Sequence, residues 1–83
     1  MTEITVRFFA AARAAAGTES DMLSLPAGAT VADAIGALAG RNDQLAGVLR
    51  KCSYLCDGVS VRDRATVLHQ HQTLDVLPPF AGG

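Results

Sequence analysis

The residues with the clearest chemical potential are Gly82 and Gly83, which stand directly after Pro78-Pro79-Phe80-Ala81. Glycine has no Cβ, so two glycines in a row can pass through a channel that a side chain would block. The α-carboxyl group of Gly83 is ionised at neutral pH. It is inert until a nucleotide activates it, after which it can accept a nucleophile such as sulfide or an amine. We therefore predict that Gly83 is the reacting residue.

The residues before Gly83 are predicted to thread it into a partner protein: Pro79, Phe80, Ala81 and Gly82. We expect a mobile tail over about residues 79–83, because groups beyond the last strand have no hydrogen bonds committed to the sheet.

Two cysteines and two histidines could also do chemistry, but simpler roles fit them better. Cys52 and Cys56 are separated by three residues and lack the second pair of ligands that a zinc site needs. Reduced cysteine beside a strand packs as a small apolar residue. His69 and His71 would share a face if extended, so a metal pair is conceivable. No carboxylate or thiol is grouped with them, which favours two histidines on a surface loop.

No familiar catalytic motif is present: the sequence lacks G-x-G-x-x-G, P-loop, nucleophile-elbow and H-E-x-x-H patterns. The run Arg62-Asp63-Arg64 is typical of a solvated turn. A triad of Ser60, His69 and Asp75 can be drawn, but no nucleophile motif supports it. We therefore expect a covalent group carrier, not a catalyst on its own, with no metal and no stably bound cofactor.

Composition narrows the class of protein further. The 83 residues are enough for one domain, residues 1–83, and the net charge of −1 has no clustered sign. Such a charge pattern favours neither a nucleic-acid nor a membrane partner. The residues after Met1 form no export signal, and no apolar run approaches the roughly 20 residues that span a bilayer. We expect a cytoplasmic protein.

Polar–apolar alternation and turn residues predict the elements of the first half. Glu3–Phe9 alternates as a half-buried strand with Ile4, Val6 and Phe8 on its inner face. A short alanine-rich helix follows over 10–16, ended by Gly17, and a strand over 21–25 precedes a turn at 26–28. Thr30 and Asp33 form the pattern of a capping box for a helix that ends at Gly40.

The second half is predicted to add a shorter helix, capped by Asp43, and three strands. Two of these strands, 54–56 and 59–61, flank the tight-turn pair Asp57-Gly58, and the last covers 73–77. The stretch 62–72 is polar and irregular, and Pro78-Pro79 ends strand pairing. We predict an α+β fold in which a mixed sheet of four to five strands packs on one main helix, with the first and last strands parallel at its centre.

Several segments together resemble a known family across the whole chain. They are Phe8-Phe9-Ala10 with Arg13, the helix start at 30–33, Asp57-Gly58, and Leu77-Pro78-Pro79-Phe80-Ala81-Gly82-Gly83. The sequence resembles the MoaD and ThiS sulfur carriers, the family that includes the small subunit of molybdopterin synthase. The resemblance implies a ubiquitin-like β-grasp fold.

The resemblance also implies a reaction and its partners. An E1-like adenylyltransferase would use ATP to adenylate Gly83, and a sulfur donor would convert the adenylate to a thiocarboxylate. The tail would then enter the large subunit of molybdopterin synthase. There its sulfur would pass to a cyclic pyranopterin precursor.

A carrier that visits two enzymes needs a shared docking face, and strand alternation predicts where it lies. With Ile4, Val6 and Phe8 inward, Phe9 points outward, as does Leu77 on the last strand, beside a pair formed by Arg7 and Asp75. Exposed large apolar residues near a reactive tail are typical of a partner site. The alternative is that the chain's own loops cover Phe9.

Two further residues, Arg13 and Val59, complete the predicted partner-binding set.

Other functions remain open from the sequence. The same chemistry could feed thiamine, cysteine or tRNA thiolation. The activated terminus could instead form isopeptides with lysines, as in a ubiquitin-like protein modifier. A plain interaction module is the third reading, because a fold alone specifies no function.

Overall fold

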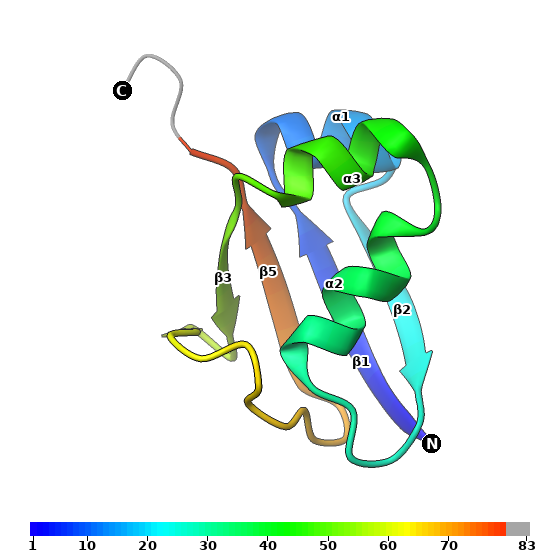
Figure 1. Ribbon diagram of the computed structural model, residues 1–83, viewed down its shortest axis with the longest axis vertical. Helices are drawn as coiled ribbons and strands as arrows, with labels where there is room; N and C mark the ends of the chain where they lie inside the picture. Colours follow the sequence, from blue (N-terminus) through cyan, green and yellow to red (C-terminus); the bar gives the residue numbers. More distant parts are fainter. Residues whose placement is uncertain (80–83) are drawn as a thin grey trace.

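The computed structural model describes residues 1–79, so the predictions for Phe80, Ala81, Gly82 and Gly83 lie outside the described residues. Residues 1–79 form one five-stranded sheet in the order β2-β1-β5-β3-β4. The strands are β1 (Thr2–Phe8), β2 (Ser20–Leu25), β3 (Ser53–Cys56), β4 (Val59–Ser60) and β5 (Thr73–Leu77), and the helices are α1 (Ala10–Ala16), α2 (Val31–Ala39) and α3 (Asp43–Leu49). The α2 helix crosses the sheet, and α1 and α3 lie at the end where β1 and β5 stop (Figure 1).

The predicted pairing of the first and last strands is confirmed. β1 pairs in parallel with β5 and antiparallel with β2, and β5 also pairs antiparallel with β3. β5 is therefore the central strand, flanked on both sides. Its five-residue run of apolar and β-branched residues, interrupted by Asp75, suits a strand with neighbours on both edges.

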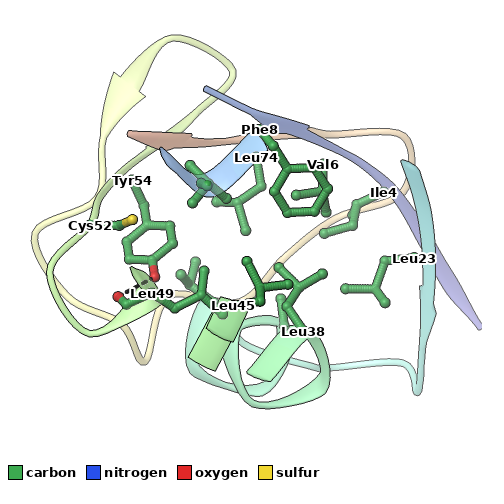
Figure 2. Close-up of a cluster of buried hydrophobic side chains, with 14 of the residues drawn as sticks. Ile4, Val6, Phe8, Leu23, Leu38, Leu45, Leu49, Cys52, Tyr54 and Leu74 are labelled. Atoms are coloured by element: carbon green, nitrogen blue, oxygen red, sulfur yellow. Dashed lines mark hydrogen bonds between the residues drawn. The ribbon is translucent and has the colours of Figure 1, made fainter. Parts of the chain in front are cut away.

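The core lies between the sheet and the helices, as Figure 2 shows. Ile4, Val6 and Phe8 point into it, as their alternation predicts, with exposed fractions of 2% or less. From the other side come Leu38, Leu45 and Leu49, and Cys52 packs at the edge of the same cluster. Burial on this scale supplies most of the stability of a chain this small.

Two of the three helix starts follow the sequence, and the third is shifted. Thr30 accepts a hydrogen bond from the Asp33 N–H while the Asp33 carboxylate accepts one from the Thr30 N–H, so the predicted capping box is confirmed. The predicted cap of α3 is wrong: Asn42, not Asp43, accepts a hydrogen bond from the Leu45 N–H at 2.6 Å. Asn42 is extended, as a cap must be, whereas Asp43 is already the first helical residue.

The turn between β3 and β4 is built from the predicted pair. Asp57 and Gly58 both have positive φ, 49° and 81°, which is the geometry of a two-residue hairpin turn. The Asp57 carboxylate accepts a hydrogen bond from the Thr73 N–H, which ties this turn to the start of β5.

The long polar stretch after β4 is irregular, as predicted, but it is anchored. Leu68 enters the core with 2% of its surface exposed, and Val67 pairs with Thr30 in an isolated β-bridge. Within residues 1–79, none of the helices is both long enough and apolar enough to cross a membrane.

A buried tyrosine makes the stability of this fold sensitive to alkaline pH. The Tyr54 hydroxyl donates to the Leu49 carbonyl oxygen at 2.9 Å (Figure 2). Burial, with a smaller contribution from the Cys52 thiolate, raises the pKa of Tyr54 to about 12. In the unfolded chain the pKa of a tyrosine is about 10. The difference between the folded and unfolded pKa values of Tyr54 contributes to the free energy of unfolding, and this contribution is present in full below pH 10.

We predict that this contribution is lost as the pH rises from about 10 to about 12. Tyr54 is the only tyrosine and the chain has no tryptophan, so tyrosinate absorbance reports it directly. Tyr54→Phe should remove this part of the pH dependence while leaving that of the thiols. A native tyrosinate midpoint near that of free tyrosine would contradict the prediction.

Candidate functional site

The parallel pairing of β1 and β5 brings the predicted docking residues to one end of the sheet. Phe8 is in register with Val76, and the next residue, Phe9, donates its N–H to the Val76 carbonyl oxygen at 3.3 Å. Phe9 then caps α1, while Leu77 ends β5 and leads into Pro78-Pro79. These residues share an apolar hollow, lined by Phe9, Ala10, Ala11, Ser53, Leu77, Pro78 and Pro79. We call this the Phe9–Leu77 surface.

The exposure of Phe9 decides whether it is an outward-facing docking residue or is covered by the chain's own loops. Phe9 is 38% exposed, whereas its neighbour Phe8 is 2% exposed. The loops within residues 1–79 therefore leave more than a third of Phe9 open to solvent. Leu77 is half-buried at the side of the same hollow. The partly exposed Phe9 ring and the half-buried Leu77 side chain thus lie beside Pro78 and Pro79, the last residues that the structure describes.

A paired arginine and aspartate support this surface. The Arg7 Nε and Nη2 donate to the two Asp75 carboxylate oxygens at 2.6 and 2.8 Å, so the predicted pair is confirmed. The guanidinium carbon of Arg7 also lies 5.5 Å from the centroid of the Phe9 ring. Arg7 thus makes a bidentate ion pair with Asp75 and a cation–π contact with the Phe9 ring. Together these two contacts fix the orientation of the Arg7 guanidinium.

The Asp75 carboxylate is less accessible than the alternation of β5 implies. Its side chain is 8% exposed although it faces away from the core, because it lies on the central strand and Arg7 covers it. The hydrogen bonds to Asp75, followed by attraction to its charge, raise the pKa of Arg7. Both carboxylate oxygens of Asp75 are bound by Arg7, and no side-chain hydrogen bond among residues 1–79 joins Asp75, His69 and Ser60, so the triad has no structural basis.

Of the other two predicted partner-binding residues, Arg13 lies near Phe9 and Val59 does not. Arg13 is on α1, forms an ion pair with Glu19 at 3.0 Å, and lines a shallow hollow together with Phe9. Val59 is 68% exposed but is in register with Cys56, which itself pairs with the inward-facing Leu74. Val59 therefore lies on the opposite side of the sheet from Leu77.

The thiols and imidazoles occupy ordinary environments. Cys52 is buried and donates its S–H to the Val48 carbonyl oxygen at 3.2 Å, and burial raises the pKa of both Cys52 and Cys56. A raised thiol pKa lowers the fraction of nucleophilic thiolate. His69 and His71 are exposed, and no cluster of three or more metal-ligating side chains occurs among the described residues.

Sequence reasoning missed contacts that depend on tertiary proximity. Arg64, expected in a solvated turn, places its guanidinium carbon 5.1 Å from the centroid of the Tyr54 ring. Ser53 lines the Phe9–Leu77 surface only because β3 pairs with β5 in the register Ser53↔Leu77. The strand signal around 54–56 could have suggested this neighbour, but the register could not be read from the sequence.

The sequence and the fold are similar to those of known proteins. The model of the ThiS family matches residues 6–83. Among solved structures, the Haloferax volcanii protein HVO 2177 is 32% identical, with a TM-score of 0.86 over 99% of this chain and 87% of that chain. Small archaeal modifier protein 1 from Methanosarcina acetivorans is 27% identical, with a TM-score of 0.85 over 100% and 98% of the two chains.

A third structure is that of a complex. It is the protein–protein complex of subunits 1 and 2 of molybdopterin-converting factor from Helicobacter pylori, in which the similar chain is 20% identical. The TM-score is 0.74, over 99% of this chain and 100% of that chain. No curated protein matches the sequence. The predicted β-grasp fold is confirmed by these likenesses.

Proposed function

This chain belongs to the ThiS family, and we propose that it is the sulfur-carrying small subunit of a molybdopterin synthase. The observation that carries the proposal is the Phe9–Leu77 surface, whose lining includes Pro78 and Pro79, the last described residues before Gly83 in the sequence. An apolar face beside a narrow glycine tail suits a protein that must dock on other enzymes and insert its end into them.

The proposed reaction has three steps, and the chain is a covalent donor in them, not the catalyst. The Gly83 carboxylate attacks the α-phosphorus of ATP in an E1-like adenylyltransferase, and pyrophosphate leaves. Sulfide from a sulfur donor then attacks the acyl carbon, AMP leaves, and a thiocarboxylate remains at Gly83. In the large synthase subunit, the thiocarboxylate sulfur attacks a cyclic pyranopterin precursor, and water then cleaves the acyl–sulfur bond and restores the Gly83 carboxylate. We expect this sequence in the cytoplasm, with ATP consumed by the activating enzyme and not held by this chain.

The pairing of two subunits has a structural parallel. The similar chain in the Helicobacter pylori structure belongs to a complex of subunits 1 and 2 of molybdopterin-converting factor. Its identity to this chain is 20%, so the likeness supports the fold and makes a two-subunit arrangement a reasonable expectation. Sulfur delivery to thiamine, cysteine or tRNA would use the same activation and a different acceptor enzyme.

A protein modifier is the second candidate function. It is favoured by the small archaeal modifier protein 1 from Methanosarcina acetivorans, which is similar to this chain over its full length. The two functions differ in the nucleophile that meets the activated carboxyl group: sulfur in a carrier, and a lysine amine of another protein in a modifier. Searching for lysine-linked adducts therefore separates them.

The docking role of the Phe9–Leu77 surface predicts which charges disrupt binding. Phe9→Asp or Leu77→Asp places an unpaired carboxylate in an apolar contact. We expect roughly 30-fold weaker binding to the large subunit, since losing a buried interface anchor costs about 2 kcal/mol or more. Calorimetric titration measures this. Melting of the free chain should change little, because Phe9 is exposed and Leu77 half-buried.

Val59→Asp is the matched control, because Val59 lies on the other side of the sheet. It should bind normally. An equal loss of affinity for the large subunit in all three variants would mean that the contact surface is not the one proposed. Unfolding of the Phe9 or Leu77 variant would mean that the residue belongs to the core.

The tail predicts a different pattern, in which activity is lost without loss of fold. Deleting Gly83 moves the carboxylate back by about 3.5 Å, which a positioned reaction does not tolerate. Gly82→Val adds a β-branched side chain where the tail must be thinnest. Both changes should abolish precursor conversion by the reconstituted synthase and leave the melting temperature unchanged.

Gly36→Ala provides the control for replacing a glycine, since an added Cβ there meets no atom within 4 Å. It should convert precursor normally. Near-normal conversion after deletion of Gly83 would show that the terminus is not the reactant.

A further inference from the structure

A second hollow adjoins the Phe9–Leu77 surface. It is lined by residues of α1 and α3, by the two residues after α3, and by Pro78 and Pro79. Ala11, Pro78 and Pro79 line both hollows, so the two meet around the end of β5. Figure 1 shows α1 and α3 at the end of the sheet where β5 stops. We call the second hollow the α3 groove, and its other lining residues include Gly47, Val48, Arg50 and Lys51.

The α3 groove contains positive charges and no negative ones. Arg50 and Lys51 line it and are exposed, and none of its lining residues is an aspartate or a glutamate. The ion pairs within residues 1–79 use other cations, which are Arg7, Arg13 and Arg41. Arg50 and Lys51 therefore have no carboxylate partner in the part of the chain that the structure describes. A partner that covers this groove must supply carboxylates, because burying an unpaired cation is costly.

Gly47 is a helix residue that the fold itself does not require to be glycine. It lies inside α3, and a Cβ added to it would meet no atom of the described residues within 4 Å. Glycine inside a helix is less stable than alanine, so its presence here has a cost in stability. A glycine also lets another backbone approach closely. In an exposed hollow, Gly47 therefore leaves the backbone of α3 open to close contact with a partner.

The two hollows together form one band on both sides of Pro78 and Pro79. The Phe9–Leu77 surface is the apolar part of this band, and the α3 groove is the cationic part. A partner that docks on the apolar part reaches the cationic part by passing Ala11 and the two prolines, which belong to both. One partner can therefore cover the whole band, provided that it presents an apolar protrusion with carboxylates beside it.

We propose that the α3 groove binds an acidic segment of the large synthase subunit. The carboxylates of that segment pair with Arg50 and Lys51, and its backbone lies against Gly47. The inference rests on the proposed function, because the large subunit is the partner assigned to the adjoining Phe9–Leu77 surface. It adds a requirement of charge to that surface. The apolar contact supplies close packing, and the two cations select a partner whose matching surface is acidic.

Calorimetric titration of the full chain with the large subunit at low salt tests the requirement of charge. Arg50→Glu and Lys51→Glu should each weaken binding roughly tenfold, because charge reversal replaces an attraction by a repulsion. The loss should shrink in about 1 M salt, where the screening length is about 3 Å. Arg62→Glu is the matched control, since it makes the same change of charge in a different hollow, and it should bind normally. An equal loss of affinity in Arg62→Glu would overturn the inference.

A glycine replacement tests the close contact independently of charge. Gly47→Gln places a side chain in the α3 groove and should weaken binding to the large subunit roughly tenfold, as overpacking of a close contact does. The melting temperature of the free chain should stay the same or rise, because glutamine is the better helix former. Gly36→Gln is the control, since Gly36 lies inside α2, has the same open space around it and lines neither hollow. It should bind normally. Normal binding by Gly47→Gln would overturn the inference.

The outcomes separate this inference from the proposed function. Absence of binding between the unaltered chain and the large subunit would overturn both. Binding that Phe9→Asp weakens and the three groove variants leave unchanged would keep the docking surface and overturn the inference alone. A parallel titration uses the E1-like enzyme, and loss of affinity for that enzyme alone would assign the groove to a different partner and overturn the inference. Weaker binding of the large subunit by the three groove variants, with normal binding by both controls, supports it.

Discussion

The parallel pairing of β1 and β5 is the constraint on which the rest of the structure depends. Because the two strands run in one direction, the chain leaves both at the same end of the sheet, at Phe9 and at Pro78. That pairing places an exposed aromatic ring beside the base of the tail, and the Arg7–Asp75 ion pair links the same two strands across their outer face. An antiparallel arrangement would send the tail to the other end, away from Phe9.

Division of labour follows from this geometry. The body buries one apolar face of its sheet under the helices and keeps a smaller apolar surface open, so stability and docking use different residues: Phe8 serves the core, and Phe9 the surface. In the proposed function, the tail contributes reach and a carboxyl group, while the activating enzyme and the large subunit contribute catalysis.

The sequence predicts the fold well because its signals are local. A period of two in β1 gives the facing of Phe8 and Phe9, and the Thr30–Asp33 pair marks the start of α2. Prediction from the sequence fails where a cap or the facing of a side chain depends on residues that are distant in the sequence. Asn42 and Asp43 are both good caps, and only packing decides between them. The facing of Val59 depends on the register across a two-residue turn, and the place of Ser53 beside Leu77 depends on the pairing of β3 with β5. The predictions for residues 80–83 remain predictions.

The central claim is that the Gly83 carboxyl group receives sulfur. The most direct measurement is fragmentation mass spectrometry of the C-terminal peptide after the full chain has been incubated with a cognate E1-like enzyme, Mg-ATP and a sulfur donor. The account predicts that one oxygen is replaced by sulfur and that the replacement maps to Gly83. An unmodified C-terminal peptide, from an enzyme shown to sulfurate another carrier in the same mixture, would contradict it.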